Sequence, residues 1–397
     1  MKVLLINDYA TRTGGAENLS LALRDGLKRR GYDARLLASS ARPLGATSFA
    51  DYECLGSLSS FRTVLQTFNP WAWWKLRQVL REFDPDLVHV TLAFTQLSPL
   101  ILPLLRNVPT VYNAQWYRAI CPVGTKALPN KEVCHFDHGL ACRRNRCLSF
   151  PDWLLLSVQM YFIDRNFNVF DRVVSASHAV KKRLSAAGIN SEVIWNGTPV
   201  CPGRQPLTSL PTVVFAGRLV WEKGVDVLLE SFARVQQQIP EATLLIAGDG
   251  IERGELESMV ARLDLQEQVF FLGHLSSVSV ESAFKEAWVQ VVPSRWAEPF
   301  GLVAAEAHMR GTAVIASNQG GLTEIVSDGE TGFLVPPDNS IALAEKLVTI
   351  LQDRKLAESF GKKGREVVLE KFSENAYVDN FLALYKILSG DGTIRGN

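Results

Sequence analysis

The sequence lacks several features that would each place it in a special class of protein. No apolar run among its 397 residues is long enough to span a bilayer. The first residues, Met-Lys-Val-Leu-Leu-Ile, enter a short strand without the longer apolar core of a signal peptide. We therefore expect a cytoplasmic protein, for which peripheral contact with the inner face of a membrane stays open. The formal net charge is only +1, so no global field favours nucleic acid, and any basic surface must be local.

Cysteine is scarce, and its six residues include no Cys-x-x-Cys pair. Four of them share one loop with two histidines: Cys121, Cys134, Cys142, Cys147, His135 and His138. This spacing does not match the usual zinc knuckles, and a disulfide would be unusual in a reducing cytosol. A structural zinc ion stays open as an alternative to free or redox-paired thiols.

The composition is that of a globular protein, and the chain is too long for a single hydrophobic core. Apolar residues make up 47% of the chain and charged residues 21%, and its length indicates two domains. Short apolar runs alternate with helical patterns, which predicts α/β domains with parallel sheets covered on both faces. The predicted strands are residues 2–8, 33–39, 87–90, 110–114, 172–177 and 192–196, then 212–219, 242–250, 268–275, 289–294, 313–318 and 332–336.

A proline-rich segment separates these two sets of strands. Residues 197–211 contain four prolines and no periodicity, so we interpret them as a linker. We place one Rossmann-like domain at residues 1–198 and a second at 199–373, with a final helix (about 374–397) returning to the first. Two such domains facing each other across a deep cleft would bind a ligand at the carboxyl ends of both sheets.

Two helical patterns in the first half allow more than one interpretation. Residues 68–83 place Trp71 and Trp74 off the expected core stripe, beside arginines. Such a face is typical of an interfacial helix on anionic lipid, and the alternative is that both tryptophans pack under a loop. The apolar run at 153–162 is either a membrane-facing lip or a core helix, and we favour the core.

The stretch from Arg295 to Glu306 predicts an anion site at the start of a helix. We expect Glu298 at the N-cap and Pro299 at the first helical position. Phe300, Gly301 and Leu302 would then offer unpaired N–H groups to a phosphate, and Glu306 would lie two turns further in. The alternative is a capped amphipathic helix with two surface glutamates.

Other glycine-rich and cationic turns follow predicted strands. Arg218 and Lys223, at the carboxyl end of the first strand of the second domain and at the next helix start, are placed to contact a diphosphate. Gly248 and His274 lie at the ends of the next two predicted strands, where backbone groups could contact a base. Gly14 and Gly15, after the first strand of the chain, allow close approach of a ligand. Each signal alone is weak.

Together the motifs resemble a known family. Gly-Gly-Ala-Glu, Gly-Arg-Leu-x-x-Glu-Lys-Gly, Ala-Gly-Asp-Gly and Glu-x7-Glu, in this order, are similar to the retaining glycosyltransferases of family 4, which have the GT-B fold. The resemblance implies a nucleotide-diphosphate-sugar donor and assigns residues to its parts. Arg218 and Lys223 would hold the diphosphate, Glu298 the sugar, the backbone of 300–302 a phosphate and Glu306 the ribose, with Gly15 closing over the donor.

One position departs from the family pattern. Gln115-Trp-Tyr-Arg-Ala-Ile-Cys-Pro122 resembles a stretch that usually begins with His. Gln115 can donate and accept hydrogen bonds but cannot move protons near pH 7. It can replace a histidine that orients the sugar, but not one that stabilises charge. We interpret His89 as a core residue at a strand end rather than as its replacement.

The resemblance implies a transferase that uses a UDP- or GDP-sugar and a glycan or lipid-linked acceptor. We expect front-face substitution in which Arg218 and Lys223 neutralise the leaving diphosphate, so that no divalent metal and no other cofactor is needed. The alternatives are a nucleotide-sugar epimerase or hydrolase and a non-catalytic nucleotide-sugar-binding protein. The nucleotide, the sugar, the acceptor and the oligomeric state do not follow from the sequence.

Overall fold

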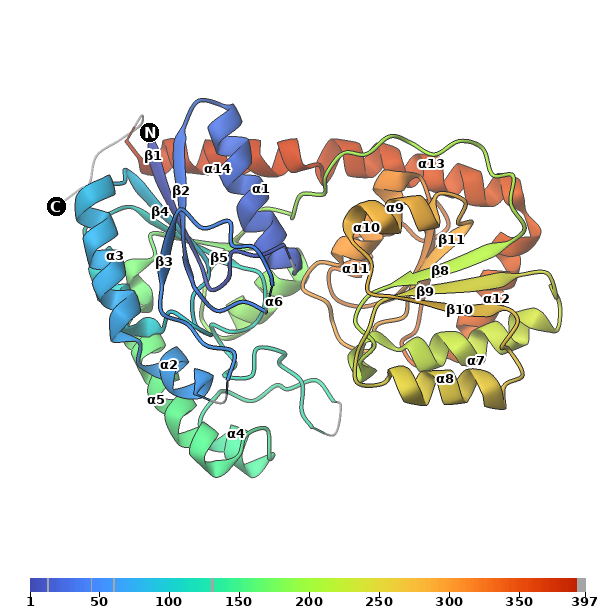
Figure 1. Ribbon diagram of the computed structural model, residues 1–397, viewed down its shortest axis with the longest axis horizontal. Coiled ribbons are helices and arrows are strands. Elements are labelled where there is room, and N and C mark those ends of the chain that lie inside the picture. Colours follow the sequence, from blue (N-terminus) through green and yellow to red (C-terminus); the bar gives the residue numbers. More distant parts are fainter. Residues whose placement is uncertain (13, 44, 60, 130–131, 391–397) are drawn as a thin grey trace. The chain divides into compact units, whose positions relative to one another are not determined.

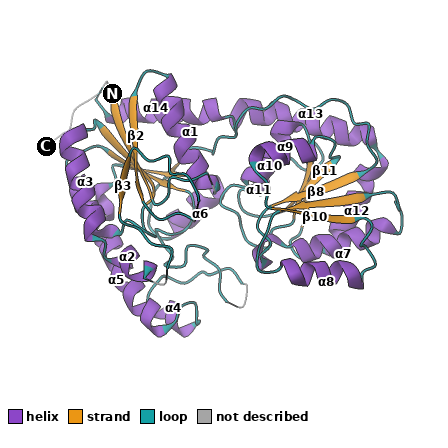
Figure 2. Cartoon of the chain, viewed as in Figure 1, coloured by secondary structure: helices purple, strands orange, loops and turns teal. Residues whose placement is uncertain are grey.

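The structure is a computed structural model that describes residues 1–12, 14–43, 45–59, 61–129 and 132–390. These residues form two compact units, which are drawn in Figures 1 and 2. Unit 1 contains Met1–Gly197 and the chain from Glu374 onward, and unit 2 contains Thr198–Ser373. Residues 391–397, which the sequence assigns to the final helix, lie outside the described residues.

Unit 1 is built on a parallel sheet of seven strands in the order β3-β2-β1-β4-β5-β6-β7. The strands are β1 (Lys2–Asn7), β2 (Asp33–Ser39), β3 (Tyr52–Cys54), β4 (Leu87–Leu92), β5 (Thr110–Ala114), β6 (Arg172–Ser175) and β7 (Glu192–Val193). All six predicted strands are present. The short edge strand β3 was missed because it contains no apolar run.

Helices cover this sheet. They are α1 (Gly15–Arg29), α2 (Arg62–Thr67), α3 (Pro70–Phe83), α4 (Leu140–Arg144), α5 (Phe150–Asn166), α6 (His178–Ala186) and α14 (Glu374–Leu388), with 3-10 turns η1 (Pro99–Leu105) and η2 (Phe167–Val169). The last helix, α14, packs on the first, α1, as Figure 1 shows. A Cβ on Gly26 would lie 2.6 Å from a methyl group of Val378, so the two helices approach closely.

The carboxyl edge of this sheet is fixed by Asp8, the residue after β1. Its buried carboxylate accepts hydrogen bonds from the backbone N–H groups of Thr95, Gln96 and Leu97 at 2.9, 2.8 and 3.1 Å. Burial raises the pKa of Asp8, and these hydrogen bonds oppose the rise. The loop that follows β4 is therefore held against the end of β1.

Unit 2 has a parallel sheet of six strands in the order β10-β9-β8-β11-β12-β13. The strands are β8 (Thr212–Ala216), β9 (Thr243–Ala247), β10 (Val269–Gly273), β11 (Val289–Val292), β12 (Ala313–Ser317) and β13 (Gly332–Val335). Each lies within a predicted strand. The predicted strands extend beyond the observed carboxyl ends, where the chain leaves the sheet to form loops.

The helices of unit 2 enclose its core. They are α7 (Val225–Gln236), α8 (Arg253–Arg262), α9 (Ser277–Phe284), α10 (Leu302–Arg310), α11 (Leu322–Ile325), α12 (Ser340–Gln352) and α13 (Arg354–Lys371), with a 3-10 turn η3 (Trp221–Lys223). Buried Phe215 and Val289 of the sheet pack with Phe232 of α7 and Leu347 of α12. No helix in the described part of the chain has the length and apolar character needed to cross a bilayer.

Candidate functional site

The loops after β8 and β11 meet at the carboxyl edge of the unit 2 sheet. The two strands are hydrogen-bonded neighbours, so their ends lie side by side. A Cβ on Gly224 would lie 2.2 Å from the carbonyl oxygen of Pro293, and φ of Gly224 is +65°, so only glycine fits this contact. The backbone N–H of Arg295 donates to Glu222 at 2.9 Å.

Arg295, to which the sequence motifs give no separate role, joins these loops. Its guanidinium forms two hydrogen bonds of 2.7 Å with the carboxylate of Asp226, in the first turn of α7, and a separate ion pair with Asp338. It also donates to the carbonyl oxygen of Trp221 at 3.1 Å. A bidentate Arg–carboxylate pair fixes the orientation of both partners, so Arg295 positions the loop that contains Lys223.

Lys223 and Glu298 form an ion pair inside this loop contact. Lys223 Nζ lies 2.7 Å from Glu298 Oε1, and both side chains are largely buried. Ser294 Oγ donates to the same oxygen at 2.5 Å, and no described residue donates to Oε2. Burial alone would raise the pKa of Glu298, but Lys223, Ser294 and Arg218 together lower it. Glu298 is therefore a fixed carboxylate with one oxygen left for a ligand.

Arg218 and Trp296 border this pair. The Arg218 side chain is exposed and forms no hydrogen bond or ion pair with any described residue, while its charge helps to lower the pKa of Glu298. The Lys223 ammonium lies 5.9 Å from the centre of the Trp296 indole, whose buried Nε1 has no hydrogen-bond partner within the described ranges. The structure thus brings together the three charged residues that the sequence assigned to the diphosphate and the sugar.

The predicted start of the following helix is wrong. Helix α10 begins at Leu302, with Gly301 as its N-cap, so Glu298 is not the cap and Pro299 is not the first helical residue. Gly301 has φ of +107°, a left-handed conformation that breaks the helix before it. Of the predicted donors, only Leu302 lies in the first turn, while Phe300 and Gly301 precede it. Glu306 lies one turn into α10 rather than two, and its side chain is exposed.

A second glycine turn explains why the chain leaves helical geometry here. A Cβ on Gly320 would lie 2.5 Å from the carbonyl oxygen of Glu298, and one on Gly321 would lie 2.5 Å from Cα of Phe300. The N–H of Gly321 donates to the carbonyl of Glu298 at 2.8 Å. The backbone at 298–300 is therefore packed against a neighbouring loop, and this tertiary contact overrides the local preference of Glu-Pro for a helix start.

Gly248 lies beside the turn that presents Arg218. Its N–H donates to the carbonyl of Gly273 at 2.8 Å. His274, which follows Gly273, is exposed. A Cβ on Gly248 would lie only 1.8 Å from the carbonyl oxygen of Gly217. The ends of β8, β9 and β10 are thus tied together through backbone contacts that leave no space for a side chain.

We expect Gly248→Ala to lower the free energy of unfolding by about 2–4 kcal/mol, because its Cβ would overlap a backbone oxygen at φ of +147°. Gly254→Ala is the matched control, since a Cβ there meets no atom within 4 Å and alanine favours the helix α8. Chemical denaturation measures both. Equal stabilities for the two variants would contradict the close contact.

In unit 1, Gly14 and Gly15 form the start of α1. Gly14 is the N-cap in an extended conformation, and the helix begins at Gly15. A Cβ on Gly14 would lie 2.1 Å from the carboxylate of Glu17. Burial raises the pKa of Glu17, and the charge of Asp8 adds to the rise. The described contacts do not test whether these glycines bind a donor, so that assignment stays a prediction.

Gln115 belongs to a buried amide network at the end of β5. Its Nε2 donates to Asn113 Oδ1 at 3.0 Å and to Asn196 Oδ1 at 2.8 Å, and its Oε1 accepts from Asn196 Nδ2 at 2.7 Å. Both ends of the amide are therefore occupied inside unit 1. A histidine could not form this reciprocal pair, so glutamine at this position has a structural reason.

His89 is a core residue. Its ring is fully buried in β4, and Nδ1 lies 2.7 Å from the hydroxyl of Tyr385 in α14. Burial lowers the pKa of His89 to about 3, so the ring is neutral at physiological pH. This agrees with its interpretation as a structural histidine rather than a replacement for the histidine of the family motif.

The amide pair gives a testable coupling. We expect Gln115→Ala and Asn196→Ala each to destabilise the protein by about 1–3 kcal/mol, because each leaves a buried amide unsatisfied. The double variant should cost less than the sum of the two, by about 1 kcal/mol, since it removes both partners. Denaturant unfolding of the four proteins measures this coupling, and strict additivity would show that the pair is not formed.

The cysteine loop does not form a metal centre from the residues that the structure describes. Cys121, Cys134, Cys142 and Cys147 are free thiols. No three His, Cys, Asp or Glu side chains within the described ranges are placed to hold a metal ion. Burial raises the pKa of Cys142 and of Cys147, and the neighbouring thiols add to the rise.

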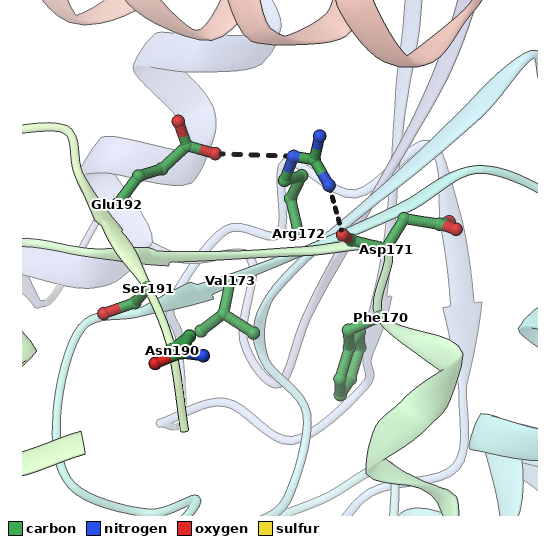
Figure 3. Close-up of a pocket in the computed structure, with 7 residues that line it drawn as sticks. All are labelled: Phe170, Asp171, Arg172, Val173, Asn190, Ser191 and Glu192. Atoms are coloured by element: carbon green, nitrogen blue, oxygen red, sulfur yellow. Dashed lines mark hydrogen bonds and ion pairs between the residues drawn. The ribbon is translucent and has the colours of Figure 1, made fainter. Parts of the chain in front are cut away.

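A surface pocket of about 410 Å³ lies elsewhere in unit 1 (Figure 3). It is lined by Phe170, Asp171, Arg172, Val173, Asn190, Ser191 and Glu192. Figure 3 shows Arg172 between the carboxylate of Glu192 and the carbonyl of Asp171. These residues stand at the amino ends of β6 and β7, whereas parallel α/β sheets bind ligands at their carboxyl ends. The pocket is therefore not our candidate site.

Two family models match the chain. The model described as Glycosyltransferase Family 4 matches residues 13–200, and the model described as Glycosyl transferases group 1 matches residues 205–367. A phosphatidyl-myo-inositol mannosyltransferase of Mycobacterium tuberculosis is 30% identical over 235 residues, which are 56% of this chain and 61% of that protein. The chain spans about half the length of the curated relatives it matches.

Two solved structures resemble the whole chain. Sucrose-phosphate synthase of Thermosynechococcus elongatus has a TM-score of 0.74 and 24% identity, over 99% of this chain and 100% of that one. HepE of Anabaena, in complex with UDP, has a TM-score of 0.70 and 20% identity, over 98% of this chain and 100% of that one. At these identities the likeness concerns the fold.

Proposed function

This chain belongs to glycosyltransferase family 4 and has the GT-B fold, and we propose that it transfers a hexose from a nucleotide-diphosphate sugar with retention at the anomeric carbon. The observation that supports this proposal best is the cluster of Arg218, Lys223 and Glu298 at the carboxyl edge of the unit 2 sheet. In parallel α/β sheets this edge is where nucleotides bind.

The residues of this cluster are suited to two different parts of the donor, the sugar and the diphosphate. Glu298 is held ionised by Lys223 and Ser294, and its free Oε2 is suited to accept hydrogen bonds from sugar hydroxyls. Arg218 is exposed and without a described partner, so its guanidinium is available for a diphosphate. The N-terminus of α10 at Leu302 supplies backbone donors to a phosphate, and exposed Glu306, whose pKa the desolvating surroundings raise to about 7, supplies a carboxyl group to the ribose.

The proposed reaction is a front-face substitution. The acceptor oxygen forms a bond to the anomeric carbon as the bond from that carbon to the diphosphate oxygen breaks, and the acceptor's proton passes to the leaving diphosphate. Arg218 and Lys223 stabilise the negative charge that develops there. Because these two cations supply the charge that a divalent ion supplies elsewhere, we propose a reaction that needs no metal and no cofactor.

We further propose a UDP- or GDP-sugar as donor and a glycan or lipid-linked sugar as acceptor, reached at the inner face of an anionic membrane. HepE, which shares the fold, was solved with UDP, so uridine nucleotides are the first donors to test. The relative named phosphatidyl-myo-inositol mannosyltransferase supports a lipid acceptor.

A binding panel tests the proposal. Calorimetry with UDP, GDP, ADP and their sugar conjugates, in the presence of a chelator, should give tight binding of one nucleotide series, and Arg218→Ala should lose it. Binding only with a divalent ion would overturn the metal-free proposal. Release of modified sugar without an acceptor would favour an epimerase or hydrolase, and binding without any turnover would favour a non-catalytic binding protein.

A further inference from the structure

Unit 1 exposes large apolar side chains on and beside α2, α3 and α5. Exposed large apolar side chains occur on all three helices: Phe61 and Val64 with Phe68 at the end of α2, Trp71 and Trp74 on α3, and Phe150, Leu154, Val158 and Tyr161 on α5. We call this set the apolar patch. Trp74 is 67% exposed, Phe68 57% and Tyr161 57%, so the alternative in which the α3 tryptophans pack under a loop is wrong.

Helix α5 shows most clearly that the patch is more than scattered exposure. Leu156, Met160 and Ile163 on one face are buried in the core. On the opposite face Phe150, Leu154 and Val158 follow each other at intervals of four residues, which places them in one row along the helix. A helix that is apolar all round is normally covered on all sides, yet this row faces solvent. The core interpretation of residues 153–162 was therefore only half right.

The three helices form one region of unit 1. Helix α2 packs on α5, where Gln159 Nε2 donates to the carbonyl of Gln66 and Thr67 Oγ1 lies 3.4 Å from the carbonyl of Leu155. Behind them, buried Arg118 donates to Gln66 Oε1 at 3.0 Å and to Gln159 Oε1 at 2.9 Å. Helix α3 follows α2 directly, and both α3 and α5 pack on η1. Figure 1 shows these helices grouped in unit 1.

Cations are interleaved with the apolar side chains. Helices α2, α3, α4 and α5 contain seven Lys or Arg residues and three Asp or Glu residues. The Arg143 guanidinium lies over the Phe150 ring at 6.0 Å, and that of Arg77 lies over the Trp73 ring at 5.3 Å. All three acidic residues already have partners, since Asp164 pairs with His138, Glu82 accepts from Gln78 and Asp152 accepts from Ser149.

We infer that the apolar patch docks unit 1 on a bilayer that contains anionic lipid. Aromatic and aliphatic side chains on helix faces enter the boundary between headgroups and acyl chains, while nearby arginines contact lipid phosphates. The excess of cations favours an anionic bilayer over a neutral one. The inference rests on the proposed function only in that a lipid-linked acceptor would explain why docking is useful.

Arg118 connects the apolar patch to the loop after β5. Arg118, which bridges α2 and α5, belongs to the same loop as Gln115 and also donates to the carbonyl of Pro122. Burial lowers the pKa of Arg118 to about 10, yet it stays charged at neutral pH. A bilayer that holds α2 and α5 would therefore also orient this loop.

Vesicle flotation of the full-length protein tests the inference. Vesicles of phosphatidylglycerol and phosphatidylcholine are compared with phosphatidylcholine alone, at low and at raised salt, without nucleotide. The patch variant Leu154→Gln/Val158→Gln/Tyr161→Gln should partition roughly tenfold less, because three apolar contacts with the bilayer are lost. A second variant, Phe61→Gln/Phe68→Gln, tests the residues beside α2 separately, and it replaces the first variant if that one does not fold.

The control replaces apolar residues outside the patch that are even more exposed than those of the patch variant, Ile251→Gln/Val278→Gln/Ile387→Gln. It should bind vesicles like the wild type. Failure of the wild type to bind anionic vesicles, or equal losses in patch and control variants, would overturn the inference. So would a wild-type dimer, detected by light scattering, that the patch variants convert to a monomer without losing vesicle binding. Nucleotide binding is measured separately, so its failure affects only the proposed function.

Discussion

Turnover of the Arg218→Ala variant is expected to fall by about 10²-fold or more, with little change in the free energy of unfolding. The guanidinium is exposed and has no hydrogen-bond or ion-pair partner in the described part of the chain, so its loss leaves no buried group unsatisfied. Its charge nevertheless acts on Glu298, which places it at the cluster. A large loss of activity without a loss of stability is the signature of a residue that contacts the ligand.

The measurement is the release of nucleoside diphosphate from the sugar nucleotide that binds in the panel, together with denaturant unfolding. Arg253→Ala is the matched control. It is another arginine at the carboxyl edge of unit 2, where it pairs with Asp249 and Glu257. It should keep nearly full turnover. If both variants lost activity equally, a general loss of positive charge would explain the result and the role of Arg218 would be refuted.

The association of Arg218, Lys223 and Glu298 could be predicted from the sequence for a physical reason. All three follow strands of one parallel sheet, and parallel strands bring their carboxyl ends to the same edge. Because β8 and β11 are neighbours, the loops that follow them lie side by side. The apolar runs that form these strands are the strongest local signal in the chain.

The start of α10 could not be predicted in the same way. Glu-Pro is a favourable local start for a helix, but the backbone of Gly320 and Gly321, some twenty residues later, occupies the space beside Glu298 and Phe300. The pairing of Gln115 with Asn196 likewise joins residues 81 positions apart. For α5, both faces are apolar, so the sequence holds no signal that tells the buried face from the exposed one.

Breaking the Lys223–Glu298 pair is expected to have the largest combined effect on stability and activity. Lys223→Met leaves a buried carboxylate without its cation, which should cost about 3 kcal/mol of unfolding free energy. Glu298→Gln leaves the ammonium unpaired and should be similarly unstable. The double variant Lys223→Met/Glu298→Gln should recover most of this stability, because neither charge remains, yet its turnover should stay at least about 10²-fold below the wild type.

The pH dependence has a definite sign. In the wild type the pKa of Glu298 lies below its ordinary value of 4.5, so the pair stabilises the protein above that pH and the stabilisation is lost as pH falls through the lowered pKa. In Lys223→Met burial is no longer opposed by Lys223, so the pKa of Glu298 should rise. The penalty of that variant should therefore be largest at neutral pH and shrink on acidification.

Arg24→Met is the control for this experiment, since it removes another largely buried cation, whose partners are Asp25 at 2.9 Å and Asp51 at 3.3 Å. It should destabilise the protein while the folded fraction keeps its turnover. Unfolding curves at several pH values and turnover of the folded protein separate the two effects. Recovery of activity together with stability in the double variant would show that the pair only holds the loops together, and that neither charge acts on the donor.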